Sequence, residues 1–227
     1  MEILRFKKIH LLTLVVLTWN DVFGDEWYSL LKSTIHSSNF NQLGVFLKQR
    51  RELFNNEVYP QQQYVFNAFK MTPLNELKVV LIGNEPYRDL NLDRGLAYAV
   101  PNGQYKPVEL VNILHEVEYD IYDGLYLHYD PTLTNWAEQG VLLLNQSLTN
   151  ERDKTINHFE QWDFFIVELL TKLSTIDNII YFLLVDERYE SIIRQNPTSY
   201  IIKKNNAKPF TLINNQLLKN NKTSILW

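Results

Sequence analysis

The 227-residue sequence contains no cysteine, which excludes disulfide scaffolds, thiolate zinc sites, iron–sulfur clusters and cysteine nucleophiles. Glycine and proline are scarce, at 7 and 8 residues, so the chain has no room for a long low-complexity linker. Hydrophobic residues make up 45% and charged residues 21%, which is typical of a globular protein and not of a disordered tail. The length suits one large domain with a sizeable core.

The formal net charge of −4 combines two unlike parts of the chain. Residues 1–190 carry −10, whereas residues 191–227 carry +6 and contain no acidic residue. The basic residues of this C-terminal part are Arg194, Lys203, Lys204, Lys208, Lys219 and Lys222. A net negative charge does not favour a nucleic-acid partner, but the basic C-terminal segment could still contact one.

The N-terminal residues superficially resemble a secretory signal, because Arg5, Lys7 and Lys8 precede an apolar run over residues 11–17. No small-residue cleavage site follows that run. The run is also shorter than the roughly 20 apolar residues that a membrane span needs. We therefore expect residues 1–16 to form a leading strand or helix that packs on the core, and we do not expect secretion.

Buried apolar runs alternate with amphipathic stretches along the rest of the chain. The runs predict strands over residues 78–83, 140–145, 178–185 and 199–202. The amphipathic stretches predict helices over residues 27–31, 46–54, 108–117, 159–173, 186–195 and 211–220. This alternation predicts an α/β fold, a three-layer αβα sandwich around a central, mostly parallel four-stranded sheet.

Residues that could carry chemistry follow the first two predicted strands, where ligands bind in such sheets. Glu85 lies on a proline-stiffened turn and is well placed to orient a water molecule, and Tyr87 could form one wall of a small pocket. Asn145 offers a donor and an acceptor on one planar amide, which suits the edge of an amide-like heterocycle. Tyr98 offers a stacking surface. Each residue also has a purely structural interpretation, as a cap, a turn residue or a core ring.

Taken together, these segments resemble family 1 uracil-DNA glycosylases. The matching segments, which stand in the family's order, are residues 17–22, 65–69, 78–87, 95–100, 136–145, 148–149, 157–158 and 225–227. Several collinear segments are more specific than any single motif. We therefore expect residues 1–16 to be an extension outside the resemblance and residues 17–227 to form one domain with the uracil-DNA glycosylase fold.

The resemblance implies a function in base-excision repair, because the family hydrolyses the N-glycosidic bond of a uracil flipped out of the DNA stack. It assigns the water-orienting, catalytic role to Glu85. It assigns uracil-binding roles to Asn84, Tyr87, Tyr98, Asn145 and His158. Among these, Asn145 would read the uracil edge, Tyr98 would stack on the base and Tyr87 would exclude the thymine methyl. No metal or organic cofactor is implied.

Several positions depart from the family pattern. Glu85 replaces the aspartate of the motif Gly-Gln-Asp-Pro-Tyr-His-Gly, and Arg88-Asp89 replaces its terminal His-Gly. A carboxylate misplaced by about 1 Å can lower a rate by about 100-fold. Glu109 stands where the family has a phosphate-gripping serine, and residues 185–187 replace a Trp-Gly-Ser segment. An acidic side chain at such positions should repel DNA phosphate.

The largest departure follows the fourth predicted strand. The family has His-Pro-Ser-Pro-Leu-Ser there, which carries the histidine that stabilises the departing uracil anion and the leucine that fills the vacated stack. Here the strand runs into Lys203, Lys204 and Lys208, and no histidine is present in this segment. These lysines could supply DNA contacts or positive charge, although an ammonium on a flexible stem is not a fixed imidazole donor.

Two main hypotheses follow. In the first, the protein is a uracil-DNA glycosylase with attenuated activity that acts on single-stranded more readily than on duplex DNA, because no base pair must be broken. In the second, it binds uracil-containing or single-stranded DNA without excision, or serves as an accessory protein in replication or repair. A decoy for DNA-mimicking inhibitors is a third hypothesis, which the acidic substitutions disfavour. We expect a monomer without membrane contact, in the cytoplasm or wherever the genome is handled.

Overall fold

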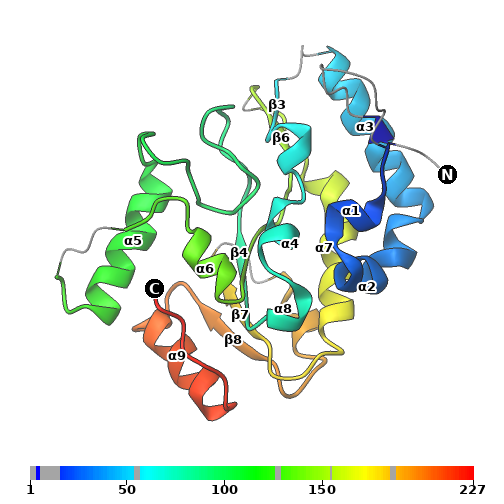
Figure 1. The fold of residues 1–227 in the computed structure, drawn as a ribbon. Coiled ribbons are helices and arrows are strands. Elements are labelled where there is room, and N and C mark those ends of the chain that lie inside the picture. The colour runs from blue at the N-terminus through cyan, green and yellow to red at the C-terminus, as the bar shows by residue number, and fades with distance from the viewer. Residues whose placement is uncertain (1–3, 6–15, 54–56, 126–128, 154, 185–187) are drawn as a thin grey trace.

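In the computed structural model, the described residues are 4–5, 16–53, 57–125, 129–153, 155–184 and 188–227. A four-stranded parallel sheet with strand order β5-β4-β7-β8 lies at their centre (Figure 1). Its strands are β4 (Val79–Gly83), β5 (Val141–Asn145), β7 (Ile180–Leu183) and β8 (Tyr200–Lys203). Every residue of β4, β5 and β7 is buried, as expected of parallel strands covered on both faces.

Helices form a layer on each side of this sheet (Figure 1). On one side α5 (Val108–Ile121) packs against α9 (Pro209–Lys219), which contacts β7 and β8. On the other side α2 (Asp25–Ile35), α3 (Ser38–Leu53) and α7 (Phe159–Leu173) contact one another. The predicted αβα sandwich around a four-stranded parallel sheet is confirmed.

Shorter elements complete the described part of the chain. The short helices are α1 (Trp19–Phe23), η1 (Gln62–Tyr64), α4 (Asn67–Met71), η2 (Leu74–Glu76), α6 (Thr134–Glu138) and α8 (Glu190–Ile193). Two antiparallel pairs join β1 (Leu4–Arg5) to β2 (Val16–Leu17) and β3 (Val58–Tyr59) to β6 (Asn150–Glu151). Helices α4 and α6 pack beside β5.

Some predicted boundaries differ from the structure. Helix α9 begins at Pro209, two residues before the prediction, because the Asp120 carboxylate accepts hydrogen bonds from the backbone N–H groups of Phe210 and Thr211, at 2.7 and 3.0 Å. Strand β7 begins only at Ile180, after Asn178 with its left-handed φ of 60°. The predicted helix over residues 186–195 is reduced to α8, and residues 185–187 lie outside the described residues.

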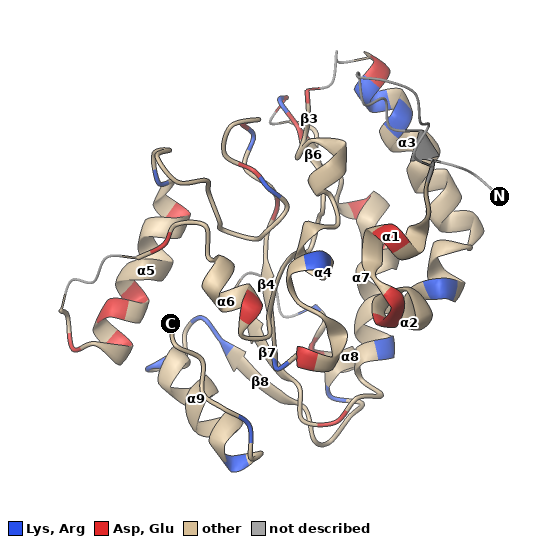
Figure 2. Cartoon of the chain, viewed as in Figure 1, with Lys and Arg blue, Asp and Glu red and all other residues tan. Residues whose placement is uncertain are grey.

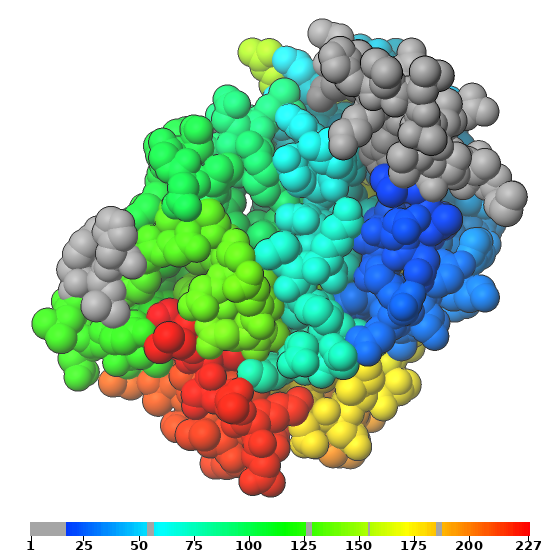
Figure 3. All heavy atoms as spheres, in the orientation of Figure 1, coloured from blue at the N-terminus to red at the C-terminus, as the bar shows by residue number. Residues whose placement is uncertain are grey.

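The last residues of the chain pack into the core. The Trp227 ring lies 5.1 Å from Trp136 and 4.9 Å from Phe210, measured between ring centroids. The Leu226 N–H also donates to the side chain of Gln139 at 2.7 Å. Figure 3 shows this red segment against the yellow-green residues that precede β5. The C-terminal residues therefore hold the segment that leads into one of the two strands that end at the site described below.

Replacing Gly44 with alanine should stabilise the protein by about 0.5–1 kcal/mol, because alanine loses less backbone entropy in a helix. Gly44 lies within α3 and is exposed, and an added Cβ would meet no atom within 4 Å. The free energy of unfolding in urea measures the effect. Gly103→Ala is the control: its Cβ also meets open space, but its φ of 80° should make alanine destabilising by about 1 kcal/mol. Equal effects of the two substitutions would contradict this explanation.

Candidate active site

Strands β4 and β5 end side by side, with Gly83 paired with Asn145 in the sheet register. A Cβ at residue 83 would lie 2.8 Å from Asn145 Oδ1 and 2.8 Å from Tyr98 Cε2. Such contacts are too close for a real Cβ, so only glycine leaves room for the amide and the ring to converge here. The structure thus brings together two of the predicted uracil-binding residues, Asn145 and Tyr98.

The backbone of Tyr98 has a left-handed φ of 66°, which is uncommon for an aromatic residue. The neighbouring Ala97 N–H donates to the carbonyl of Leu143 in β5 at 3.0 Å, and the Tyr87 hydroxyl donates to the Tyr98 carbonyl at 3.1 Å. Strained backbone of this kind persists only where the surroundings hold it, and it clusters at functional sites. Tyr87 therefore fixes the segment that presents the Tyr98 ring.

The two tyrosines have neutral hydroxyls at physiological pH. Burial raises the pKa of Tyr98 to about 12, and the nearby Glu109 carboxylate acts in the same direction. Burial, followed by Glu109, raises the pKa of Tyr87 still further. Glu109 lies in the first turn of α5, and its negative charge acts on both hydroxyls.

Asp93 connects the two segments that carry these tyrosines, and sequence reasoning missed it. Its carboxylate is only 2% exposed and accepts hydrogen bonds from the backbone N–H groups of Tyr87 at 2.9 Å and Gly95 at 2.7 Å. Burial raises the pKa of Asp93 to about 7, against the opposing effect of these two donors. Gly95 has a φ of 76°, and a Cβ there would lie 1.7 Å from the Tyr64 carbonyl oxygen. No local sequence pattern distinguishes such an aspartate from a solvated loop residue.

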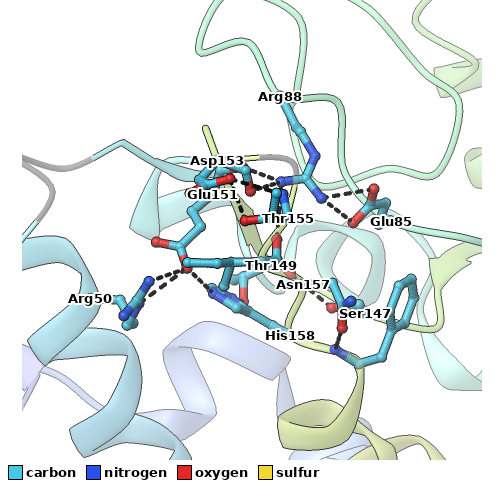
Figure 4. Close-up of polar contacts among 12 residues, drawn as sticks. Arg50, Glu85, Arg88, Ser147, Thr149, Glu151, Asp153, Thr155, Asn157 and His158 are labelled. Atoms are coloured by element: carbon cyan, nitrogen blue, oxygen red, sulfur yellow. Dashed lines mark hydrogen bonds and ion pairs between the residues drawn. The ribbon is translucent and has the colours of Figure 1, made fainter.

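Glu85 follows β4, and its carboxylate is bound by Arg88 (Figure 4). Arg88 Nη2 donates to Glu85 Oε2 at 2.9 Å and to Oε1 at 3.1 Å. Arg88 Nη1 donates to the backbone carbonyls of Glu151, Asp153 and Ile156. The guanidinium thus joins the turn after β4 to the segment around β6.

Asn84 is exposed at the start of the same turn. Its side-chain oxygen accepts from Gln146 Nε2 at 2.8 Å, and its backbone carbonyl accepts from the Ser147 N–H at 3.1 Å. Both contacts tie the turn after β4 to the residues that follow β5. The side chain of Asn84 is therefore engaged with the protein.

His158 has no solvent-exposed surface and belongs to a buried network (Figure 4). Its Nδ1 lies 2.8 Å from Thr149 Oγ1 and its Nε2 lies 3.3 Å from Glu151 Oε1, so both ring nitrogens have protein partners. Arg50 Nη2 also binds Glu151 Oε1, at 2.6 Å. Burial lowers the pKa of His158, although the Glu151 carboxylate opposes this effect. The structure thus places the His158 ring within the protein, away from any open surface.

The predicted DNA-binding lysines lie at the end of β8 and in the loop between β8 and α9. Lys203, at the end of β8, forms an ion pair with Glu190 at 2.5 Å, while Lys204 and Lys208 are exposed. In the sheet, β7 lies between β8 and β4. Figure 2 shows blue residues on the loop between β8 and α9 and red residues along α5.

The described residues contain neither a metal-binding cluster nor a membrane-spanning helix. In the part of the chain that the structure describes, no group of three or more histidine, aspartate and glutamate side chains is arranged to hold a metal ion. Within the same residues, no helix is long and apolar enough to cross a bilayer.

Comparison with known proteins identifies the family. No protein-family model matches the chain. The uracil-DNA glycosylase of Lysinibacillus sphaericus is 30% identical over 223 residues, which cover 91% of this chain and 97% of that protein. The uracil-DNA glycosylase of Streptococcus thermophilus is 35% identical over 188 residues, which cover 82% and 84%. The chain belongs to the uracil-DNA glycosylase family.

Solved structures show that the fold is also that of uracil-DNA glycosylases. The crystal structure of mimivirus uracil-DNA glycosylase matches with a TM-score of 0.80 and 20% identity, over 93% of this chain and 89% of that one. A variant of the mimivirus enzyme in complex with UGI matches with a TM-score of 0.78 and 19% identity. The predicted uracil-DNA glycosylase fold is confirmed, and the roles of its individual residues stay predictions.

Proposed function

We propose that this protein hydrolyses the N-glycosidic bond of flipped-out uracil in DNA and acts in base-excision repair. The observation that carries the proposal is the convergence of the Asn145 amide and the Tyr98 ring on the bare Cα of Gly83. An amide can both donate to and accept from the edge of uracil, and a ring can stack on its face. Membership of the uracil-DNA glycosylase family supports the same function.

We propose the following roles for the other residues, and their contacts support them. Glu85 orients the attacking water, since its side chain remains 24% exposed beside Arg88. Tyr87, held by its hydrogen bond to the Tyr98 carbonyl, forms the wall that excludes the thymine methyl. Asn84 contributes its backbone to the pocket. His158 acts indirectly, because it supports Glu151, whose backbone carbonyl binds Arg88.

We infer that the activity is attenuated relative to other family members. Only residues 204–208 join β8 to α9, and no histidine lies between Tyr200 and Phe210. Loss of one preorganised donor to the leaving group lowers a rate by about 10²–10³-fold. In parallel assays, the L. sphaericus enzyme should release uracil faster by about that factor.

Contacts with DNA are proposed for the exposed Lys204 and Lys208 together with Lys203. They offer positive charge, whereas Glu109 places negative charge beside the tyrosines and disfavours a close phosphate there. We therefore propose that single-stranded DNA is the better substrate, because it requires no extrusion from a base pair. Residues 17–227 act as one domain in this proposal, with a hydrophobic core that includes residues from Val22 to Trp227.

The test compares three oligonucleotides that differ in one base or in strand state. Wild-type protein should release free uracil from a single-stranded uracil-containing strand, more slowly from its duplex, and nothing from the matched strand with thymine. The strand with thymine tests whether Tyr87 excludes the thymine methyl group from the pocket. No uracil above a buffer control, with protein in excess over DNA, would refute the proposal.

One observation favours a second candidate, a protein that binds uracil-containing or single-stranded DNA without excision. Both carboxylate oxygens of Glu85 are already bonded to Arg88. The affinity of such a protein for single-stranded DNA would fall as the salt concentration rises, and neutralising Lys204 and Lys208 would reduce the slope of log affinity against log salt by about 1.4. Salt-dependent binding with no release of uracil would support this candidate, as would association with a replication or repair protein.

A further inference from the structure

Arg88 joins the predicted catalytic residue Glu85 to a distant part of the chain. Its side chain is only 14% exposed, and the guanidinium lies between the Glu85 carboxylate and the backbone around β6 (Figure 4). The partners on its two sides are 3 and 63–68 residues away in the sequence, so Arg88 joins parts of the chain that only the fold brings together.

The contacts of Arg88 fix its guanidinium from both sides. Nη1 donates to three backbone carbonyls, with distances of 2.8 Å to Asp153 and 3.2 Å to Ile156 in addition to the contact with Glu151. The guanidinium is planar and rigid, so contacts at both Nη1 and Nη2 restrict its orientation. Nη2 then lies 2.9 and 3.1 Å from the two oxygens of Glu85.

This arrangement constrains a flexible catalytic side chain. Glutamate has one more rotatable bond than aspartate and loses more rotamer entropy when it is held in one place. Each carboxylate oxygen can accept more than one hydrogen bond, so the contact with Arg88 leaves capacity for a water molecule. The 24% exposure of Glu85 gives water access to it.

We propose that Arg88 is a positioning residue for uracil excision: it holds the Glu85 carboxylate where it orients the attacking water. The proposal rests on the proposed glycosylase function. It differs from a purely structural role, in which Arg88 would only join two loops and would act independently of Glu85.

A double-variant cycle separates the two roles, with uracil release from a single-stranded oligonucleotide measured with protein in excess. R88M should lower the rate by about 100-fold, the effect of a misplacement of about 1 Å, while the protein concentration that gives the half-maximal rate stays within about twofold. In the E85Q background, R88M should lower the rate by less than about twofold, because the two residues act as a unit. R88K should recover part of the rate, since an ammonium can contact the carboxylate but cannot span both sets of acceptors.

R94M is the matched control. Arg94 lies in the same loop, donates to the carbonyls of Leu90 and Asp93 and packs over the Tyr64 ring, but does not contact Glu85. R94M should leave the rate unchanged. Equal losses in R88M and R94M, or the same loss from R88M in wild-type and E85Q backgrounds, would overturn the positioning role.

The folding of each variant is checked by thermal unfolding. If R88M does not fold, R88K takes its place in the cycle: an equal loss in both backgrounds would again overturn the proposal. Absence of uracil release by the wild type would refute the glycosylase function itself. A wild type that releases uracil and an R88M variant that matches it would refute only the role of Arg88.

Discussion

Replacing Asn145 with alanine should lower the rate of uracil release by about 10³-fold, the upper range for the loss of one preorganised polar group. Asn145 is 7% exposed at the end of β5, and its Oδ1 lies over Gly83 beside the Tyr98 ring. Without the amide, one edge of the base would face alkyl groups and have no hydrogen-bonding partner. Single-turnover release from a uracil-containing single strand measures the effect.

Asn215→Ala is the matched control, because Asn215 is exposed on α9 and its loss removes an amide far from the pocket. It should leave the rate unchanged. Thermal unfolding of both variants shows whether the loss reflects the site or the fold. A folded Asn145→Ala variant with the wild-type rate would mean that another group reads the base.

Replacing Arg50 with methionine should destabilise the protein by about 3 kcal/mol, because it leaves a buried carboxylate without its cation. Glu151 has a side chain that is 2% exposed, and Arg50 binds its Oε1 through Nη2 at 2.6 Å and Nε at 3.1 Å. This value is at the lower end of the range for breaking a buried ion pair, because His158 still contacts Glu151 Oε1. Urea unfolding measures the change.

Arg152→Met is the control for this stability prediction. Arg152 also pairs with a glutamate, Glu57, at 2.7 Å, but its side chain is 72% exposed. Solvent screens such a pair, so its loss should leave the urea midpoint unchanged. Similar midpoints for the Arg50 and Arg152 variants would show that burial of Glu151 does not determine the effect.

The sheet and part of the site could be predicted from sequence because their signals are local. Strands β4 and β5 are short apolar runs that are buried along their whole length, and α7 has the range predicted from its amphipathic pattern. Ligands bind at the carboxyl ends of parallel strands, so the residues after the first two predicted strands were the candidates for the site. In the sheet register, Gly83 at the end of β4 pairs with Asn145 at the end of β5.

Other features of the site could not be predicted, because they depend on how the loops fold in space. Arg88 binds carbonyls of residues 151–156, and Asp93 binds the N–H groups of residues on both sides of it only when the loop folds back. The sequence also carried no sign that the His158 ring is wholly buried beside Glu151. Periodicity and motif spacing carry no signal for such contacts.

The structure shows where the acidic and basic parts of the chain lie. The basic C-terminal segment contributes β8, α9 and the loop between them, where Lys204 and Lys208 are exposed. The negative charge of Glu109 instead raises the pKa values of Tyr87 and Tyr98. An acidic total is therefore compatible with a DNA partner that approaches the loop after β8.

The most direct test is a time course of free uracil released from a single-stranded uracil-containing oligonucleotide, with wild-type protein in excess over DNA and E85Q as the comparison. If uracil is excised at the site formed by Gly83, Tyr98 and Asn145, the wild type should release close to one uracil per strand. The E85Q variant should release uracil much more slowly. A wild type that releases no more uracil than buffer, or an E85Q variant as fast as the wild type, would contradict excision at this site.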